Sequence, residues 1–430
     1  MKNTSPIIHL IIICLVVILG VTYLRLNPEL LNTILKRPEH TGSGVVLTPE
    51  NYAQEEADSA ADGSFNEDPD LVVQAEDIGV GDDGIGDVGD IDIGDANEAL
   101  LTNPYFGVFE LPLYGTSGYA SVKMNVIDEF GAVVAALAPG DAFTILMQDG
   151  SRFSVELTDG RTGYVETKYV MVNLPDLIPS IVYRDTNSRS SIFRSSGHSL
   201  PAVTGEKLYD VYFDNPRLGE TQYVMPVLYT MAQKIMLAQQ EAWSNGDSLL
   251  LYESFRPLDV QKHVGTVLSQ LAVEYPEVNE GLNTPPWSQS WFIAMTLSNH
   301  QRGCAIDTSL VRVTETETRQ CGSYTYNVVT GYSEYEMPTA MHELSYAAAT
   351  FLTPVSSKDD VAWRSAALAP TMTESAIRLQ EYCTNSGMSP LASEWWHFND
   401  LYARQETSDN PSYGQYRLKE CVSRAPQKSE

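Results

Sequence analysis

Between Glu50 and Glu98 the chain carries 17 acidic residues and no lysine or arginine. A segment with this density of like charge cannot bury enough apolar surface to form a core. It holds more than half of the net charge of −29. Folded domains must therefore lie outside it, and a chain of 430 residues is long enough for two or three of them.

The acidic segment ends in a run of aspartate and glycine, GVGDDGIGDVGDIDIGDANE, over residues 79–98. Aspartates at this density can bind Ca²⁺, which prefers several oxygen ligands. Their spacing, however, fits neither an EF-hand loop nor a nonapeptide repeat. We therefore predict that residues 26–103 form a disordered, self-repelling acidic linker that holds the following domains away from the membrane.

Residues 7–24, IIHLIIICLVVILGVTYL, contain no lysine, arginine, aspartate or glutamate. This apolar run is at the lower limit of the length that spans a bilayer. A cleaved signal peptide is the alternative interpretation, but the residues that follow lack a small-x-small cleavage pattern. We predict an uncleaved transmembrane anchor within residues 1–25. Charge bias alone does not favour export, because Lys2 precedes the run whereas three basic residues follow it within residues 25–37.

Five cysteines are present, and Cys14 lies in the apolar run. The other four are Cys304, Cys321, Cys383 and Cys421. An even number in an exported domain is compatible with two disulfides, for which three connectivities exist. Four separate buried thiols are an equally good interpretation of the same pattern.

Residues 104–174 alternate short apolar runs with turn signals, which predicts a small, all-β, antiparallel barrel. The turn pairs are Pro139-Gly140, Asp149-Gly150 and Asp159-Gly160. The stretch DGRTGYVETKYV, residues 159–170, resembles the last strands of the bacterial SH3-like domain, although Arg152-Phe153 stand where many members carry a tryptophan. The resemblance implies either docking onto cell-wall peptides or a spacer role.

Residues 175–430 alternate helical and strand patterns without the regular spacing of a doubly wound fold, so we predict an α+β domain. Apolar residues recur at helical spacing from Pro226 to Gly246 and again over residues 260–271. Between them, SLLLYESF, residues 248–255, predicts a buried strand.

Two polar residues in SNHQRGCAIDTSL, residues 298–310, indicate a metal site. The apolar run after Gly303 predicts a strand, whose alternation directs Asp307 to one face. The glycine turn lets His300 return toward that face. Together, His300 and Asp307 can supply two ligands to one metal ion.

A third ligand is offered by His397 in SEWWHFND, residues 393–400. Catalytic zinc usually has three protein ligands and an open position, and a separate carboxylate takes the proton of the attacking water. Glu394 suits that role if the segment bends, because residues three apart on a straight strand face opposite ways. We predict one Zn²⁺ per chain, with His300, Asp307 and His397 as ligands and Glu394 as the catalytic base.

These two stretches, together with YESFRP at residues 252–257, resemble the zinc D,D-peptidases, most closely the D-alanyl-D-alanine dipeptidases of vancomycin resistance. The similarity covers residues 180–405, with the motifs in the family's order. It implies a zinc D,D-peptidase domain with the ligands and base named above. It also implies that Arg256 holds the substrate and the developing oxyanion, and that Ser298 lies on the substrate side.

One departure from the family lies in EMPTAMHELS, residues 336–345. Family members carry an acidic residue, which grips the free amino group of the substrate, where we align His342. Glu343 takes that place if the alignment shifts by one residue. A neutral imidazole does not replace a carboxylate, so we expect a relaxed requirement for a free amino terminus.

Cys304 lies three residues before Asp307, and a thiolate there would compete as a soft zinc ligand. Strand alternation points it away from Asp307. We predict that Cys304 forms a disulfide, with Cys321 as its partner.

These features predict a single-pass, membrane-anchored zinc metallopeptidase with its catalytic domain outside the cell, acting as a D,D-dipeptidase or D,D-carboxypeptidase in cell-wall metabolism. The expected partners are the D-Ala-D-Ala dipeptide or a peptidoglycan stem peptide, and the cell wall through the SH3-like domain. The alternatives are an endopeptidase that cuts elsewhere in the stem peptide and a non-catalytic wall-binding protein. Nucleic acid is excluded, because no basic stripe is present to neutralise phosphates.

Overall fold

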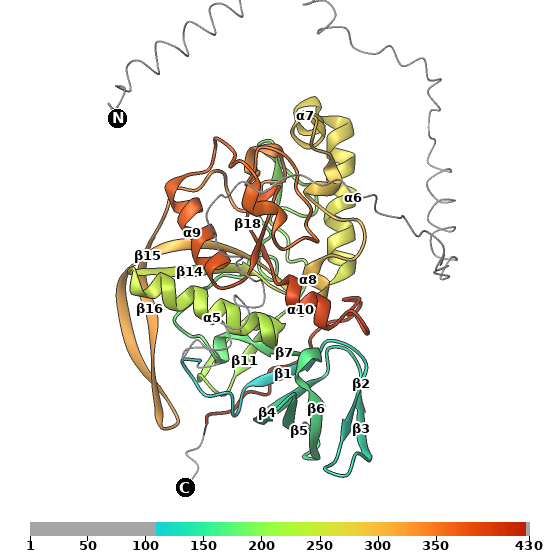
Figure 1. Cartoon of the computed structure of the whole chain (residues 1–430), viewed down its shortest axis with the longest axis vertical. Helices are drawn as coiled ribbons and strands as arrows, with labels where there is room; N and C mark the ends of the chain where they lie inside the picture. The colour runs from blue at the N-terminus through green and yellow to red at the C-terminus, as the bar shows by residue number, and fades with distance from the viewer. Residues whose placement is uncertain (1–108, 427–430) are drawn as a thin grey trace, which may run out of the picture. The chain divides into compact units, whose positions relative to one another are not determined.

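Figure 1 shows the computed structural model of the chain, which describes residues 109–426. The predicted anchor, residues 1–25, and the predicted acidic linker, residues 26–103, lie outside the described residues. Between residues 109 and 426, no helix combines the length and the apolar character needed to cross a bilayer.

The first sheet has eight strands in the order β13-β7-β1-β4-β5-β6-β2-β3, and its pairs are antiparallel. Its strands are β1 (Ser117–Ala120), β2 (Met124–Ile127), β3 (Val133–Leu137), β4 (Ala142–Asp149), β5 (Arg152–Leu157), β6 (Thr162–Glu166), β7 (Val170–Asn173) and β13 (Pro226–Leu228). The predicted turns at Gly140, Gly150 and Gly160 are confirmed, since each has a positive φ that favours glycine. The pairings form an open series in which no described strand joins β13 to β3, so closure into an SH3-like barrel stays a prediction.

Strand β13 corrects one expectation from the sequence. The helical pattern beginning at Pro226 predicts a helix there, but the first three residues pair with β7 and the helix begins at Tyr229. A proline is tolerated as the first residue of an edge strand, where its missing N–H costs no ladder hydrogen bond. The first sheet therefore crosses the boundary expected between residues 174 and 175.

The second sheet holds the strands predicted to carry the metal ligands. Its order is β17-β18-β15-β14-β8, with β16 paired to β15; the β14–β8 pair is parallel and the others are antiparallel. The strands are β8 (Val182–Tyr183), β14 (Asp247–Glu253), β15 (Ala305–Cys321), β16 (Tyr324–Glu334), β17 (Ser389–Leu391) and β18 (Glu394–Asn399). Strand β14 is the buried strand predicted from SLLLYESF, and it is buried on both faces.

Six α-helices surround these strands within residues 109–426. They are α5 (Tyr229–Ser244), α6 (Leu258–Glu274), α7 (Pro276–Asn283), α8 (Asn299–Arg302), α9 (Glu374–Asn385) and α10 (Leu401–Glu406). Helix α5 packs against β14 and α9, and α6 packs against α7 (Figure 1). The short hairpins are β9 (Arg194–Ser195) with β10 (His198–Ser199), and β11 (Tyr212–Asn215) with β12 (Glu220–Tyr223). This combination of helices and sheets agrees with the predicted α+β class.

The main core is continuous between the two sheets. Phe143 and Phe153 of the first sheet belong to the same buried cluster as Leu250, Trp396 and Phe398 of the second. The tail after α10 also packs on the first sheet. The Thr144 hydroxyl donates to the Val422 carbonyl over 2.9 Å, and the Arg424 amide donates to the Gly115 carbonyl over 2.7 Å.

The predicted disulfide between Cys304 and Cys321 is wrong for this structure, in which both residues are free thiols. Strand β15 runs unbroken from residue 305 to Cys321. At about 3.3 Å per residue, a strand of this length separates its ends by roughly 50 Å, far beyond the reach of a disulfide. Cys383 and Cys421 are also free, so the alternative of separate thiols holds for the four cysteines between residues 109 and 426.

Candidate metal centre

Three neighbouring strands bring three side chains of the site into line. In the registers of the second sheet, Asp307 on β15 pairs with Glu253 on β14 and with His397 on β18. Directly paired residues have Cβ atoms only about 4.5–5.5 Å apart. The sheet therefore places Asp307 between a carboxylate and an imidazole, although the three residues are far apart in the sequence.

His300 reaches the same point from the short helix α8. Ser298 and Gln301 form a capping box at the start of this helix, and Gly303 ends it with a φ of 74°. The predicted turn at Gly303 is thus confirmed. The ring of His300 is oriented by its Nδ1 atom, which lies 2.6 Å from the carbonyl oxygen of Ser254.

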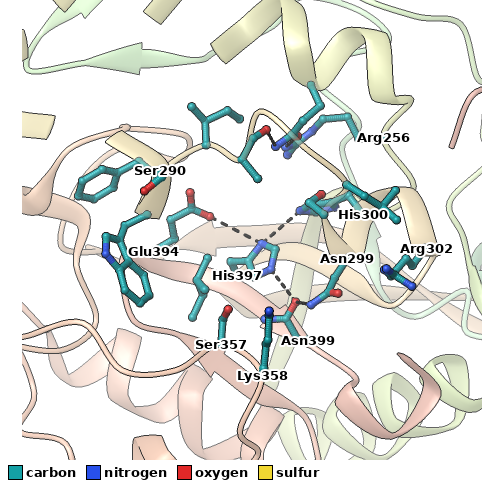
Figure 2. Close-up of a pocket in the computed structure, with 18 of the residues that line it drawn as sticks. Arg256, Ser290, Asn299, His300, Arg302, Ser357, Lys358, Glu394, His397 and Asn399 are labelled. Atoms are coloured by element: carbon teal, nitrogen blue, oxygen red, sulfur yellow. Dashed lines mark hydrogen bonds and ion pairs between the residues drawn. The ribbon is translucent and has the colours of Figure 1, made fainter. Parts of the chain in front are cut away.

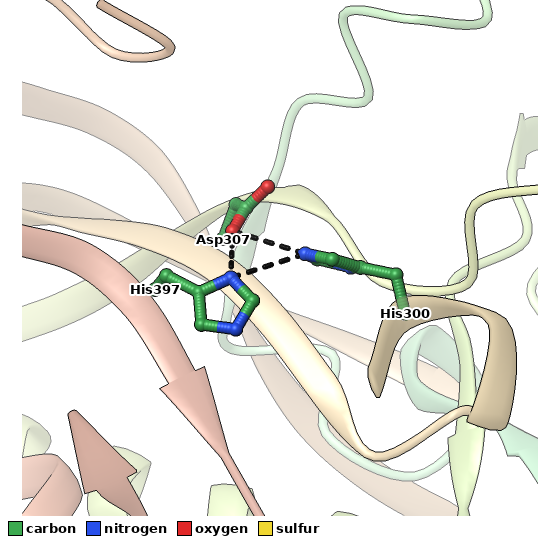
Figure 3. A group of neighbouring side chains, drawn as sticks. All are labelled: His300, Asp307 and His397. Atoms are coloured by element: carbon green, nitrogen blue, oxygen red, sulfur yellow. Dashed lines mark hydrogen bonds and ion pairs between the residues drawn. The ribbon is translucent and has the colours of Figure 1, made fainter. Parts of the chain in front are cut away.

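The three predicted metal ligands converge on one point, as Figure 3 shows. His300 Nε2 lies 3.1 Å from His397 Nδ1 and 3.3 Å from Asp307 Oδ1, and the third side of this triangle, from His397 Nδ1 to Asp307 Oδ1, is 3.0 Å. Four ligands at zinc distances of about 2.0–2.2 Å would be roughly 3.3–3.6 Å apart in a tetrahedron. The spacing is close to what three ligands of one zinc ion require.

The hydrogen bonds around the two rings leave lone pairs directed at this point. His300 Nδ1 faces a carbonyl oxygen and must carry the proton, so its Nε2 presents a lone pair. His397 Nε2 lies 2.9 Å from the Asn399 amide oxygen, which also accepts from the Asn299 amide, so in the neutral ring Nδ1 presents a lone pair. Three electron-pair donors thus face one another, and a cation between them would satisfy all three.

The electrostatics of the triangle also favour a positive charge. Burial lowers the pKa of His300 and keeps that ring neutral. Burial acts in the same direction on His397, but the hydrogen bond and the charge of Asp307 outweigh it and raise the pKa of that ring. Burial likewise opposes ionisation of Asp307, yet the neighbouring His300, His342 and His397 hold its pKa well below the usual range. Asp307 is therefore an ionised carboxylate, and the residues fit a divalent metal ion.

The second oxygen of Asp307 has different partners. Its Oδ2 accepts from Arg256 Nη2 over 3.0 Å and lies 3.1 Å from His342 Nε2. Arg256 also binds Glu253 through Nε, over 2.8 Å, and through Nη2. Glu253, Asp307 and His342 are thus a second close group of metal-ligating residue types, but the Arg256 guanidinium already pairs with both of its carboxylates.

Arg256 itself is held from several sides. Its Nη1 donates to Gln261 Oε1 over 2.6 Å, and its guanidinium lies 5.2 Å from the ring centroid of Phe193. Glu253 also accepts from the Tyr209 hydroxyl over 2.9 Å. Arg256 has five N–H groups. Its two bonds to Glu253 and its single bonds to Asp307 and Gln261 use four of them, so one remains for another acceptor.

A cavity of about 190 Å³ opens onto the triangle, and Figure 2 shows the side chains that line it. His300, His397, Glu394, Arg256 and Ser298 are all among its lining residues. The cavity is smaller than the roughly 300–1,000 Å³ of pockets for drug-sized ligands, and it suits a ligand the size of a peptide end.

Glu394 lies beside His397, with 3.7 Å between its Oε2 atom and His397 Nδ1. Burial raises the pKa of Glu394 to about 8, against the opposing charge of His397. The predicted bend between the two residues is present, because the pairing of β17 with β18 shifts register where Leu391 meets Glu394. Both side chains can therefore face the same cavity.

The residues predicted to bind substrate divide into two groups. Ser298 lines the cavity, although its hydroxyl already donates to Gln301 Oε1 over 2.8 Å. His342 and Glu343 are not among the lining residues. His342 is fully buried, stacks on Phe193 with ring centroids 4.3 Å apart, and contacts Asp307 from behind. Glu343 accepts from the Ser196 amide and, over 3.0 Å, from the Ser345 hydroxyl.

Two residues that contact the site were missed in the sequence. Glu253 is an acidic residue inside the apolar run SLLLYESF, and a charge in a buried strand is a signal that it has a buried partner. Asn399, two residues after His397, could have been found as an amide placed to orient that ring. No residue type indicates the Ser254 contact, which comes from the backbone.

The chain matches no protein-family model and no curated protein.

Proposed function

We propose that this chain is a zinc-dependent peptidase that hydrolyses D-alanyl-D-alanine bonds, in the free dipeptide or at the end of a cell-wall stem peptide. The observation that carries the proposal is the convergence of three electron-pair donors, from His300, Asp307 and His397, beside the buried carboxyl of Glu394 in one small cavity. The likeness of the motifs to those of zinc D,D-peptidases supplies the substrate class.

His300, Asp307 and His397 would hold the zinc ion. When bound, zinc supplies a positive charge that polarises a carbonyl group and acidifies a water molecule. The positive charge also favours the ionised form of Glu394, whose pKa of about 8 otherwise leaves it protonated near neutral pH. Ionised Glu394 accepts the proton of the attacking water and passes it to the amine of the leaving D-alanine.

Arg256 has a separate role in this scheme. It lines the cavity, and Glu253, Asp307 and Gln261 fix its guanidinium through four N–H groups. The fifth N–H can donate to the oxygen of the substrate carbonyl, where negative charge develops during attack. Because the group is already fixed, it needs no reorganisation in the transition state.

We also propose that the peptidase domain acts outside the cell, tethered by the apolar segment at residues 7–24 and spaced from the membrane by the acidic linker. D-Ala-D-Ala ends belong to the cell wall, which lies outside the membrane. The first sheet would contact the wall or extend the tether.

The test combines metal analysis with hydrolysis of D-Ala-D-Ala and of an N-acylated peptide ending in D-Ala-D-Ala. We expect about one zinc per chain and release of D-alanine by the wild type. Glu394→Gln should lower kcat by about 10²- to 10⁴-fold, the usual contribution of a general base, while zinc content stays the same. Zinc-free wild-type protein, or full activity in Glu394→Gln, would contradict the proposal.

A further inference from the structure

Three cationic side chains line one part of the cavity: Arg302, Lys358 and Arg404. Figure 2 shows Arg302 and Lys358 near Asn299 and Asn399, while Glu394 lies on the other side of His397 in this view. The same three cations also line a neighbouring cavity of about 330 Å³. They therefore face the space next to the candidate metal centre and its continuation outward.

Within residues 109–426, none of these three cations forms an ion pair with a carboxylate. Glu394 is the sole acidic side chain among the described residues that line the first cavity, and the second cavity has none among its described lining residues. The ion pairs within residues 109–426 engage other cations, such as Lys234 with Asp400 and Arg417 with Asp259, and include none of the three. In a chain with 56 acidic and 27 basic residues, this is an unusual concentration of unpaired positive charge.

The first cavity also has apolar lining residues. They are Trp291, Phe292, Ile293, Leu297 and Leu391. A ligand that fills the cavity thus meets both apolar surface and positive charge. A peptide with a carboxylate near its scissile bond has this distribution of polarity.

We propose that Arg302, Lys358 and Arg404 form an anion-binding subsite for a carboxylate of the substrate peptide; the inference rests on the proposed peptidase function. Two of the cations belong to the elements that carry metal ligands or directly follow them. Arg302 and His300 are both on α8, and Arg404 is on α10, which begins at Leu401, just after the strand that carries His397. The distance between the reacting carbonyl and the bound carboxylate is therefore fixed by rigid elements.

The first experiment measures kcat and KM of the full chain for pairs of peptides. One pair ends in D-Ala-D-Ala as the free acid or the C-terminal amide. The other carries an acidic side chain or the corresponding amide at the preceding residue. In one of the two pairs, the wild type should prefer the acid over the amide and the variants should not. That pair identifies which carboxylate is bound. The variants are Lys358→Met and Arg404→Met, with Lys123→Met, at an exposed site between β1 and β2, as the control.

Each variant should raise KM for the acid form by about three- to tenfold, because a charge-assisted hydrogen bond is lost at a partly exposed site. The amide form should be hydrolysed equally well by all proteins, and kcat should change little. Equal KM values of wild type and both variants for every acid peptide would overturn the proposal, as would the same loss with the amides.

A second measurement separates this proposal from the proposed function. Succinate serves as the anion that occupies the subsite. A separate amine-acylating reagent then modifies the lysines, and peptide mass spectrometry follows the acylation of Lys358 and Lys123. Succinate should slow acylation of Lys358 but not of Lys123 in the wild type, and Arg404→Met should abolish this protection. If the wild type hydrolyses no peptide but protection is seen, the peptidase function fails and the anion site stands. Equal acylation of Lys358 with and without succinate would overturn the subsite.

Discussion

The two oxygens of Asp307 face two clusters of similar composition and different chemistry. On the Oδ1 side lie His300 and His397, whose ring nitrogens are within 3.3 Å of it. On the Oδ2 side lie His342, Arg256 and, through Arg256, Glu253. Both sides combine carboxylate and imidazole groups close enough to share a metal ion.

The difference between the clusters is the supply of positive charge. The Oδ2 cluster already contains a guanidinium that donates to both of its carboxylates, so part of their negative charge is compensated within the cluster. The Oδ1 cluster contains ring nitrogens whose protons are used elsewhere, so its lone pairs have no internal donor when both rings are neutral. Residue type and proximity therefore do not define a metal site; the direction of protons and lone pairs does. Four predictions test this contrast.

The largest effect should come from Glu253→Gln, which removes one carboxylate partner of the buried Arg256 guanidinium. Glu253 is fully buried, and Arg256 would keep only Asp307 as a carboxylate partner. Loss of one member of a buried ion pair costs about 3–5 kcal/mol of stability. Urea unfolding measures this, with Glu317→Gln, an exposed partner of Arg319, as a control expected to cost less than about 1 kcal/mol. A similar unfolding free energy for wild type and Glu253→Gln would contradict a stabilising role of this buried ion pair.

Removing a ring from the other cluster should affect metal binding more than stability. Structural zinc sites bind with about 10–16 kcal/mol, or roughly 3 kcal/mol for each of four ligands. His300→Ala or His397→Ala should therefore weaken zinc by more than about a hundredfold. Competition with a chromophoric chelator measures the affinity, and His198→Ala, at a site on the β9–β10 hairpin, is the control. An unchanged zinc affinity in either ligand variant would contradict the assignment of the Oδ1 cluster as the metal site.

His342 contacts Asp307 from the Oδ2 cluster, and its replacement should have an intermediate effect. Its Nε2 contacts the metal-ligating carboxylate from behind, and partners of this kind contribute about 10- to 100-fold to metal affinity. His342→Ala should weaken zinc by about that factor, whereas His342→Gln, which keeps an N–H donor, should recover part of the loss. If both variants bind zinc as the wild type does, the Oδ2 cluster does not support the metal centre.

The smallest effect is a pH dependence. His397 can bind metal through Nδ1 only when this atom is unprotonated, and Asp307 raises the pKa of the ring. Zinc affinity should therefore fall as the pH falls below that pKa, by about tenfold per unit. His300, whose pKa burial lowers, releases no second proton in this range. At a pH below the pKa of His397, calorimetry of Glu394→Gln in buffers of different ionisation enthalpy should thus give about one proton released; a value near zero or two at that pH would refute the assignment.

The sequence predicts the Oδ1 cluster better than the Oδ2 cluster, for a physical reason. His300, Gly303 and Asp307 lie within one turn and one strand, so local geometry brings them together. His397 could be proposed only as a residue of the right type, with support from the motif resemblance, because its pairing with Asp307 is a long-range strand register. His342 was assigned to the substrate side from an alignment, but its positive φ of 59° and its stacking on Phe193 direct it behind the site.

The fold shows the same division between local and distant information. The turns at Gly140, Gly150 and Gly160 and the buried strand β14 were predictable, because each depends on a few adjacent residues. The separation of Cys304 from Cys321 was not predictable, since the pattern does not reveal that β15 continues unbroken to Cys321. The disulfide predicted between them is therefore wrong. The pairing of β13 with β7 was missed because an apolar run beside a helix fits either element.

The pairing of β13 with β7 has a practical consequence for dissecting the chain. A cut at residue 175 would separate two hydrogen-bonded strands and would also detach residues 420–424 from the surface of β1 and β4. Neither fragment would retain the apolar contacts of the shared core. When the two fragments are co-expressed, however, they should associate and fold together. This junction is therefore suitable for a split-protein reporter.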